Sequence, residues 1–206
     1  LDINKSIYYF SLAADQNHAE ALYYLGEIYY EGEYVKQDKN RAILYLTRAA
    51  KRNDSDSQFY LGLIYYEAEN NEQDIYKGID YIMQSLKNGN IRANFVLGFL
   101  YHEGKYLKRD IKKAIEFYKE ASSFNNEYAK NNLGILYKNG FGSEIEKNIK
   151  AAKIYFKEAI RQNNNLKAMY NLAHIYIYEE GTENSINKSI KLLMNSSKFE
   201  PSFTLL

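Results

Sequence analysis

Hydrophobic positions along this chain follow the period of an α-helix, and the whole pattern recurs every 36 residues. The segment from Ala19 to Glu31 places Leu22, Leu25, Ile28 and Tyr29 on one stripe, which predicts an amphipathic helix. A Leu-Gly pair marks each copy: Leu25-Gly26, Leu61-Gly62, Leu97-Gly98 and Leu133-Gly134, with a relaxed copy, Leu172-Ala173, after 39 residues. Self-similarity at such a period is typical of a stacked repeat array, which buries a continuous core between neighbours.

A second series of residues predicts where the other helix of each repeat begins. Side chains that accept hydrogen bonds from free N–H groups at a helix start recur in register: Asp2, Asp38, Asp74, Asp110, Asn148 and Ser185. Each precedes an apolar pattern of helical spacing, such as Ile43, Leu46 and Ala50. We therefore predict a helix pair in every repeat, with these residues as N-caps of the second helix.

Glycine serves two purposes in the predicted pair. The glycine of each Leu-Gly pair lets the second helix approach closely, at an intrinsic helix cost of roughly 1 kcal/mol relative to Ala. Gly32, Gly104, Gly140 and Gly181 are expected to end the first helix, where glycine adopts a left-handed conformation easily. The second repeat has Ala68 instead, so its turn is expected to differ.

The predicted fold is an all-α superhelix, or solenoid, of about five helix-pair repeats with a half repeat at each end. The expected units form one uninterrupted array over residues 1–206: a half unit 1–18, then 19–54, 55–90, 91–126, 127–164 and 165–200, and the start of another at 201–206. The chain opens on Leu1, and neither end shows the polar closing repeat of natural arrays. We expect the sequence to be part of a longer polypeptide.

These residues resemble the Sel-1-like repeat, a relative of the tetratricopeptide repeat with a longer inter-helix loop. The resemblance is carried by Ala21, Leu25-Gly26, Tyr29 and Glu31-Gly32, followed by Val35, Asp38, Ala42 and Ala49-Ala50, and it recurs through nearly the whole chain. A plain tetratricopeptide array would have a period of about 34 residues. The departures are Ala68 and Gly78 in repeat two, three extra residues in repeat four, and Ser189 and Ser196 in the last. The resemblance implies an adaptor or scaffold for protein complexes, and it implies no catalytic residue or cofactor.

Composition narrows the function classes. No segment of 18 or more consecutive apolar residues is present, so no membrane insertion is expected, and no signal-peptide pattern opens the chain. The absence of cysteine excludes disulfides and thiolate chemistry. A net charge of +1 argues against an RNA-binding array of the pentatricopeptide kind, so no nucleic-acid partner is expected. We expect a cytoplasmic protein.

The charge is nevertheless unevenly distributed. Residues 1–103 carry a net charge of −5 and residues 104–206 carry +6. One interpretation is that the asymmetry orients a partner or drives end-to-end self-association. The other is a solvated surface of drifting composition, screened over about 8 Å at physiological salt.

A stripe of first-helix positions predicts the partner-binding surface. First helices are expected to line the concave face, and the positions around each Leu-Gly pair share one face at helical spacing. Aromatic side chains with a polar tip dominate interface hot spots, although an aromatic residue on a solenoid helix also packs against the next repeat. The predicted partner-binding residues are Tyr23, Glu27, Tyr30, Phe59, Tyr66, Phe95, Phe99, His102, Asn131, Lys138, Tyr170 and His174.

The sequence gives little support for a catalytic or metal-binding site. His18, His102 and His174 are far apart in sequence, and Gly140-Phe141-Gly142-Ser143 lacks the Gly-Lys-Ser/Thr ending of a phosphate loop. We predict a non-enzymatic scaffold that holds a protein or peptide on its concave, aromatic-rich face and needs no cofactor or metal. Two alternatives stay open: a regulatory or targeting segment of a larger enzyme, such as a kinase or a ubiquitin-ligase component, and a self-assembling array.

Overall fold

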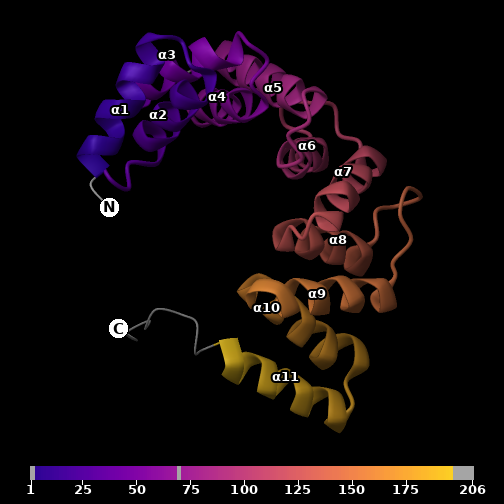
Figure 1. Ribbon diagram of the computed structural model, residues 1–206. Coiled ribbons are helices and arrows are strands. Elements are labelled where there is room, and N and C mark those ends of the chain that lie inside the picture. Colours follow the sequence, from indigo (N-terminus) through magenta and orange to yellow (C-terminus); the bar gives the residue numbers. More distant parts are fainter. Residues whose placement is uncertain (1–2, 69–70, 197–206) are drawn as a thin grey trace. The chain divides into compact units, whose positions relative to one another are not determined.

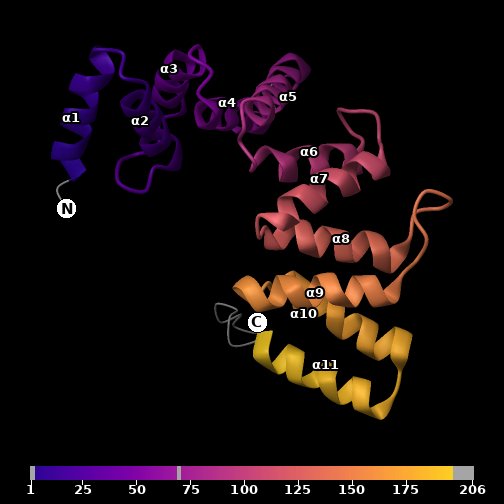
Figure 2. The same ribbon diagram turned by 45° about the vertical axis from the view of Figure 1, so that its right-hand side comes forward.

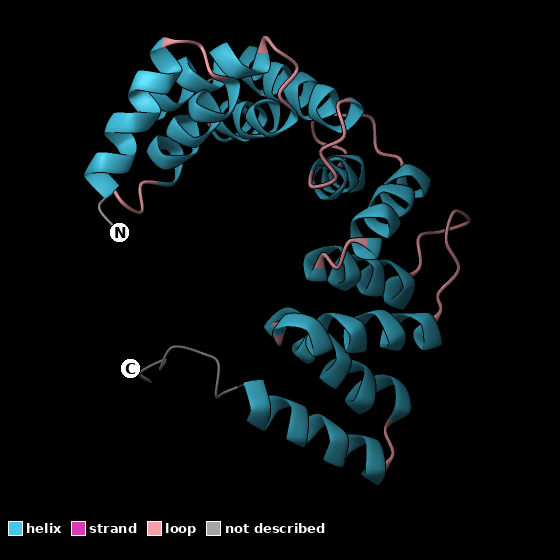
Figure 3. Ribbon diagram, in the orientation of Figure 1, coloured by secondary structure: helices cyan, strands magenta, loops and turns pink. Residues whose placement is uncertain are grey.

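The computed structural model describes residues 3–68 and 71–196, and within these ranges the chain is built from helices and loops (Figure 3). The helices follow one another as antiparallel pairs (Figure 1). The chain divides into two compact units, residues 1–97 and 98–206, and the division falls inside helix α6 (Ala93–Glu103). The all-α class predicted from the sequence is confirmed.

Unit 1 contains the half pair α1 and two complete pairs. Its helices are α1 (Ile3–Asp15), α2 (Ala19–Glu31), α3 (Lys39–Ala50), α4 (Ser55–Glu67) and α5 (Glu72–Lys87). Unit 2 continues with α7 (Ile111–Ser123), α8 (Glu127–Asn139), α9 (Ile149–Asn163), α10 (Leu166–His174), the π-helix η1 (Ile175–Glu180) and α11 (Glu183–Ser196). In both units a second helix such as α3 or α9 packs against the first helix of its own pair and against the first helix of the next.

The Leu-Gly pairs form the contact between the two helices of a repeat, as predicted. The leucines Leu25, Leu61, Leu97 and Leu133 are buried, and so is Leu172. A methyl group at Gly62 would lie 2.5 Å from the side chain of Ile82, and one at Gly98 would lie 2.7 Å from the ring of Tyr118. Gly26 and Gly134 face Leu46 and Phe156 in the same way. Glycine is therefore needed because a large side chain of the second helix occupies the space of its missing Cβ.

A stacked aromatic pair recurs in the first four complete repeats and accounts for many of the tyrosines. The ring centroids of Tyr29 and Tyr45, and those of Tyr65 and Tyr81, are 6.0 Å apart with nearly parallel planes. In unit 2 the equivalent distances are 5.7 Å for Tyr101–Phe117 and 5.6 Å for Tyr137–Tyr155. Such pairs add stability beyond the area that they bury. These tyrosines are therefore structural, joining the two helices of a repeat.

The N-cap series is confirmed at three positions and wrong at two. The side chains of Asp38, Asp110 and Asn148 accept hydrogen bonds from the backbone N–H three residues on. In repeat two the cap is Asn71, whose Oδ1 accepts from Asp74 N at 2.8 Å while its Nδ2 donates to the Asp74 carboxylate at 2.9 Å. This reciprocal pair starts α5 one turn earlier than predicted.

At the last repeat, Thr182 Oγ1 accepts from the backbone N–H of Ser185, so Ser185 lies inside α11 and is not its cap. The Ser185 side chain is buried and donates to the carbonyl of Tyr176 at 2.8 Å. The predicted cap Asp2 and the helix start predicted at 201–206 lie outside the described residues.

The predicted glycines end the first helices with positive φ, at 69° for Gly32, 70° for Gly104, 68° for Gly140 and 60° for Gly181. Ala68 instead stays right-handed, with φ −61°, so the turn of repeat two differs as expected. In the last repeat the closing glycine comes two residues later, relative to the leucine, than in the others, and η1 absorbs the extra length as a wider turn. This widening accompanies the burial of two consecutive residues, Ile175 and Tyr176.

A third series of residues shapes the turn from each second helix to the next first helix. Asn17, Asn53, Asn125 and Asn164 have φ between 50° and 66°, and Gly89 takes the same place with φ 96°. Asn tolerates the left-handed region better than other residues with a Cβ. The next residue then caps the following helix in three repeats: Asp54 caps α4, Asn126 caps α8 and Asn165 caps α10.

Candidate functional site

A continuous row of aromatic rings in unit 1 runs from α1 across the first helices α2 and α4. Neighbouring centroids lie 5.3 Å apart for Phe10–Tyr24, 5.1 Å for Tyr24–Tyr23, 6.1 Å for Tyr23–Tyr60 and 5.3 Å for Tyr60–Tyr30. We call these five residues the tyrosine belt. They come from α1, α2 and α4, so the belt crosses from one repeat to the next.

Two glutamates hold the hydroxyl groups of the belt. Glu27 Oε1 accepts from Tyr23 at 2.6 Å and from Tyr60, in the next repeat, at 2.8 Å. Glu67 accepts from Tyr30 at 2.9 Å and forms an ion pair with Lys39 at 3.2 Å. Hydrogen bonds to a charged group are stronger than neutral ones. The rings are therefore fixed in orientation, which reduces the entropy that a bound partner would cost.

Three tyrosines of the belt have raised pKa values. Burial and then the hydrogen bond to Glu27 raise the pKa of Tyr23 above its ordinary value. Burial and then the hydrogen bond to Glu67 raise the pKa of Tyr30 in the same way. Burial also raises the pKa of Tyr60, while Arg92 acts in the opposite direction. All three phenols are therefore neutral donors at physiological pH.

Arg92 packs against the α4 end of the belt. Its guanidinium is 2.6 Å from Asp56 and lies over two rings, 4.6 Å from the centroid of Phe59 and 5.3 Å from that of Tyr60. A planar cation stacks on aromatic faces in this way. Phe59 is only 8% exposed under this cation, so it supports the belt rather than offering surface.

An acidic hollow of about 270 Å³ lies beside the belt. Glu27, Glu31 and Glu33 line it together with Ile28 and Tyr34. Glu31 and Glu33 have no hydrogen bond or ion pair within the described part of the chain. The arrangement can receive a cationic side chain, which would meet carboxylates and an aromatic ring together.

The other predicted residues of unit 1 and α6 contribute less surface. Tyr66 and Phe95 are half-buried, and both take part in interactions within the protein.

In unit 2 the predicted residues do not form one row of rings. Phe99 is 38% exposed on α6, and half-buried His102 has its Nδ1 3.5 Å from the hydroxyl of buried Tyr118. Burial lowers the pKa of His102, so the imidazole is neutral at physiological pH. Asn132 Nδ2 donates to the same hydroxyl at 3.1 Å. His102, Tyr118 and Asn132 thus connect α6, α7 and α8, and their polar groups interact mainly with one another.

Further along unit 2, Asn131 is 4% exposed and accepts from Asn171 Nδ2 at 3.0 Å, which joins α8 to α10. Lys138 is half-buried in the last turn of α8. Tyr170 is 43% exposed, and exposed His174 contacts the ring of Tyr178 at 4.6 Å. The first-helix face of unit 2 is thus more polar than that of unit 1.

Several contacting residues were absent from the prediction, among them Phe10, Tyr24, Tyr60, Arg92 and Asn171. Tyr60 and Asn171 each stand one position before the repeat leucine, whereas the predicted stripe began two positions before it. Arg92 lies ahead of α6. A signal was present for Tyr60, since Tyr24 occupies the same position one repeat earlier and also belongs to the belt.

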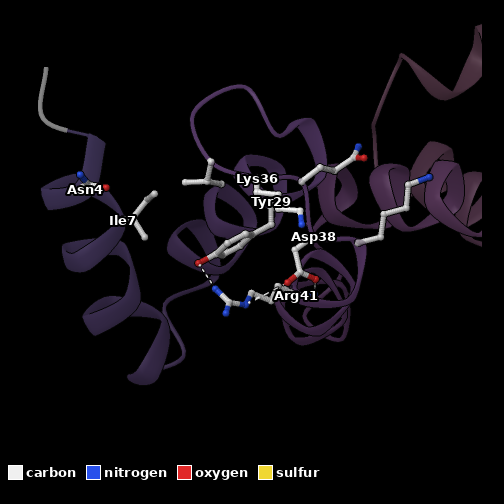
Figure 4. A pocket seen from close by; sticks show the side chains of 9 residues that line it. Asn4, Ile7, Tyr29, Lys36, Asp38 and Arg41 are labelled. Atoms are coloured by element: carbon white, nitrogen blue, oxygen red, sulfur yellow. Dashed lines mark hydrogen bonds and ion pairs between the residues drawn. The ribbon is translucent and has the colours of Figure 1, made fainter.

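A hollow of about 710 Å³ lies between α1 and the loop that joins α2 to α3 (Figure 4). Three of its polar groups are joined: Arg41 is 3.1 Å from the hydroxyl of Tyr29 and 3.3 Å from the carboxylate of Asp38, which is itself the cap of α3. The hollow is therefore a structural feature of the helix pair rather than a candidate reaction site.

The described residues contain no group of three or more His, Asp or Glu side chains placed to hold a metal ion. Among the same residues, no helix has the length and apolar character needed to cross a membrane.

Comparison with known proteins agrees with the architecture. The Sel1 repeat matches residues 2–18, 19–54, 55–90, 91–123, 127–164 and 166–193. The chain belongs to the Sel1 repeat family. Proteins of this family are generally protein-interaction scaffolds and typically non-catalytic. No curated protein matches the chain by sequence.

Several solved structures with the same fold are bacterial proteins. A Sel1 repeat protein from Oxalobacter formigenes superposes with a TM-score of 0.81 at 26% identity, covering 97% of this chain and 80% of that one. The protective antigen c5321 of uropathogenic Escherichia coli strains also gives 0.81, at 23% identity, covering 94% of this chain and 41% of that one. The immunity protein PA5088 of Pseudomonas aeruginosa gives 0.60 at 14% identity, covering 96% and 75%. The last two similarities concern the fold alone.

Proposed function

We propose that this protein is an interaction scaffold whose unit 1 binds a basic segment of a partner protein across the tyrosine belt and the adjoining acidic hollow. The observation that carries the proposal is the row of five rings from α1, α2 and α4, beside a hollow with two glutamates that are unpaired within the described part of the chain. Aromatic anchors fixed by hydrogen bonds are typical of interface hot spots. The carboxylates and ring faces favour Lys or Arg in the partner.

Of the twelve residues predicted from the sequence, Tyr23, Glu27 and Tyr30 belong to this surface, and Tyr24, Tyr60 and Glu31 join them. Tyr24 is 37% exposed and is the belt ring most open to a partner. The remaining predicted positions, including Tyr66, Phe99 and Tyr170, stay predictions for further contacts of the same partner.

A peptide-display selection on the purified protein tests the proposal, because it needs no knowledge of the natural partner. Enriched peptides are expected to be rich in Lys and Arg, and their affinity is then measured by fluorescence anisotropy. A variant carrying Tyr24→Ala, Glu31→Gln and Glu33→Gln should bind them at least about tenfold more weakly, since a tenfold change corresponds to only about 1.4 kcal/mol.

The matched control is Tyr9→Ala, which removes an exposed tyrosine from α1, a second helix, and should leave the affinity unchanged. Equal binding of the basic peptides by the parent and the triple variant, with both fully helical, would refute the assignment of this surface.

A further inference from the structure

A separate groove in unit 2 is lined by residues of α9, α10, η1 and α11. These helices follow one another at the C-terminal end of the described chain (Figure 2). It encloses about 330 Å³, and its floor is formed by Ile160, Leu172, Tyr176 and Leu192. Leu172 and Tyr176 also belong to the core of the unit, so the floor is firmly packed. The groove lies on the side of the second helices α9 and α11, and it shares no residue with the tyrosine belt or the acidic hollow of unit 1.

Four cationic side chains surround this apolar floor. Lys157 and Arg161 stand one turn apart on α9, and Lys188 and Lys191 stand opposite them on α11. Within the described residues none of the four has a hydrogen bond or an ion pair. Two neighbouring lysines do form ion pairs: Lys147 with Glu179 and Lys153 with Glu180. The four rim cations are therefore left without an anion.

Four neighbouring cations without an anion lower the stability of the folded protein, and a bound anion would offset this cost. Like charges one turn apart on a helix, as in Lys157 and Arg161, are unfavourable by a few tenths of a kcal/mol. Among the residues that the structure describes, no Asp or Glu lines the groove to relieve the repulsion. An anionic group seated at the rim would be attracted by all four cations, and low salt would strengthen that attraction.

The floor and the rim together specify the ligand. The apolar floor needs an apolar group, and the cationic rim needs flanking anions. Nucleic acid offers phosphates and flat bases but lacks the apolar side chain that the floor needs. The volume accommodates one or two large side chains and is at the lower limit for a small-molecule pocket. A peptide with a hydrophobic anchor meets all of these conditions.

We propose that this groove binds an acidic segment of a partner protein, which inserts a large apolar side chain such as Leu or Phe between α9 and α11 while its flanking Asp or Glu side chains meet Lys157, Arg161, Lys188 and Lys191. The site does not depend on the tyrosine belt. Its ligand is acidic, whereas the ligand proposed for the tyrosine belt is basic. The two proposals can therefore be tested independently.

The test uses the whole chain and synthetic fluorescein-labelled peptides of about twelve residues that are rich in Glu and carry a central Leu-Leu or Phe. Binding is followed by anisotropy at about 50 mM salt, where exposed charges are weakly screened. Two companion peptides change one feature each: the first replaces the apolar anchor by Ser, and the second replaces every Glu by Gln. The acidic anchored peptide should bind at least about tenfold more tightly than either companion.

The site itself is tested by the variant Arg161→Glu with Lys191→Glu, which should weaken binding of the anchored peptide about tenfold or more. The milder pair Arg161→Gln with Lys191→Gln, which preserves the surface, should give a smaller loss. The matched control is Lys150→Glu with Lys167→Glu, two exposed cations of the same unit that do not line the groove. This control should bind like the parent.

Several outcomes would overturn the proposal. The anchored peptide does not bind, or the Ser companion binds equally well, or the loss is the same in the Lys150/Lys167 control. Displacement by an oligonucleotide or by phosphatidylserine vesicles that also bind the parent more tightly than the peptide would assign the rim to a polyanion instead. Failure of the tyrosine-belt variants would leave all of these results unchanged.

Discussion

Gly78 offers a sharp test of the packing between the two helices of a repeat. At the equivalent position three other repeats have alanine, namely Ala42, Ala114 and Ala152, and all three are fully buried. A comparison of repeats would therefore recommend Gly78→Ala as a stabilising change, because consensus substitutions often stabilise and because Ala in a helix is favoured over Gly by about 1 kcal/mol.

The structure predicts the opposite sign. A Cβ at Gly78 would lie 2.7 Å from the backbone nitrogen of Tyr66 and 2.8 Å from the backbone oxygen of Gly62. Ordinary contacts of this kind are about 3.5 Å, so α4 and α5 would have to separate by several tenths of an ångström. Both neighbours are backbone atoms and cannot turn aside as a side chain can. Overpacking costs roughly 1–3 kcal/mol, which exceeds the helix gain and leaves a net loss of about 1 kcal/mol.

The measurement is urea unfolding followed by far-UV circular dichroism, comparing transition midpoints at equal slope. Asp80→Ala is the matched control, because Asp80 is exposed on the same helix and its replacement improves helix propensity without a new contact. We expect the control to be unchanged or slightly more stable and Gly78→Ala to be less stable. A gain of about 1 kcal/mol in Gly78→Ala would show that α4 and α5 are not in close backbone contact.

Two further predictions concern the turns and the tyrosines. Asn53, at φ 62°, is expected to tolerate Gly with little change, whereas Asn53→Ala should lower the free energy of unfolding by about 1 kcal/mol, as checked by the same urea titration. The second prediction concerns alkaline pH, because Tyr23 and Tyr30 have pKa values raised above 10 in the folded state by burial and by their carboxylate partners. Their stabilising contribution is complete below about pH 10, the unfolded value, and is lost as the pH rises further, since only the unfolded chain then releases these protons. Thermal midpoints measured from about pH 9 to about pH 11 should therefore fall less steeply in a Tyr23→Phe, Tyr30→Phe variant than in the parent, and equal slopes would contradict the assignment.

The strict features of the fold were predictable because they repeat. The Leu-Gly pair recurs without change in four repeats, and its burial follows from the helical pattern alone. Caps were less predictable where two candidates stand close together. Asn71 and Asp74 are both good caps, and only their geometry shows that Asn71 begins the helix. The late closing glycine Gly181 was a visible sign of η1, but spacing alone does not say which kind of turn absorbs the added length.

The candidate site was less predictable than the fold, because the sequence gives the face of a helix but not its neighbours. Tyr23 and Tyr60 stand at different positions relative to their leucines, yet both hydroxyls donate to Glu27. Only the placement of α4 beside α2 brings them together. Phe59 and Asn131 lie on the predicted stripe but are covered, by Arg92 and by the contact with Asn171. Which side chains of a stripe stay open is decided between repeats rather than within one.

The two proposed sites give a physical meaning to the opposite charges of the two halves of the chain. Unit 1 supplies an acidic surface at Glu31 and Glu33, and unit 2 supplies a cationic groove at Arg161 and Lys191. The segment Glu31-Gly32-Glu33-Tyr34 is itself acidic, and its exposed aromatic ring has the chemistry that the groove of a second copy would accept. The same glutamates cannot hold a basic partner and enter a neighbour's groove at once. Self-association and scaffold function would therefore compete, so a basic peptide bound to unit 1 should dissociate any assembly that forms at low salt, which sedimentation with and without the peptide would reveal.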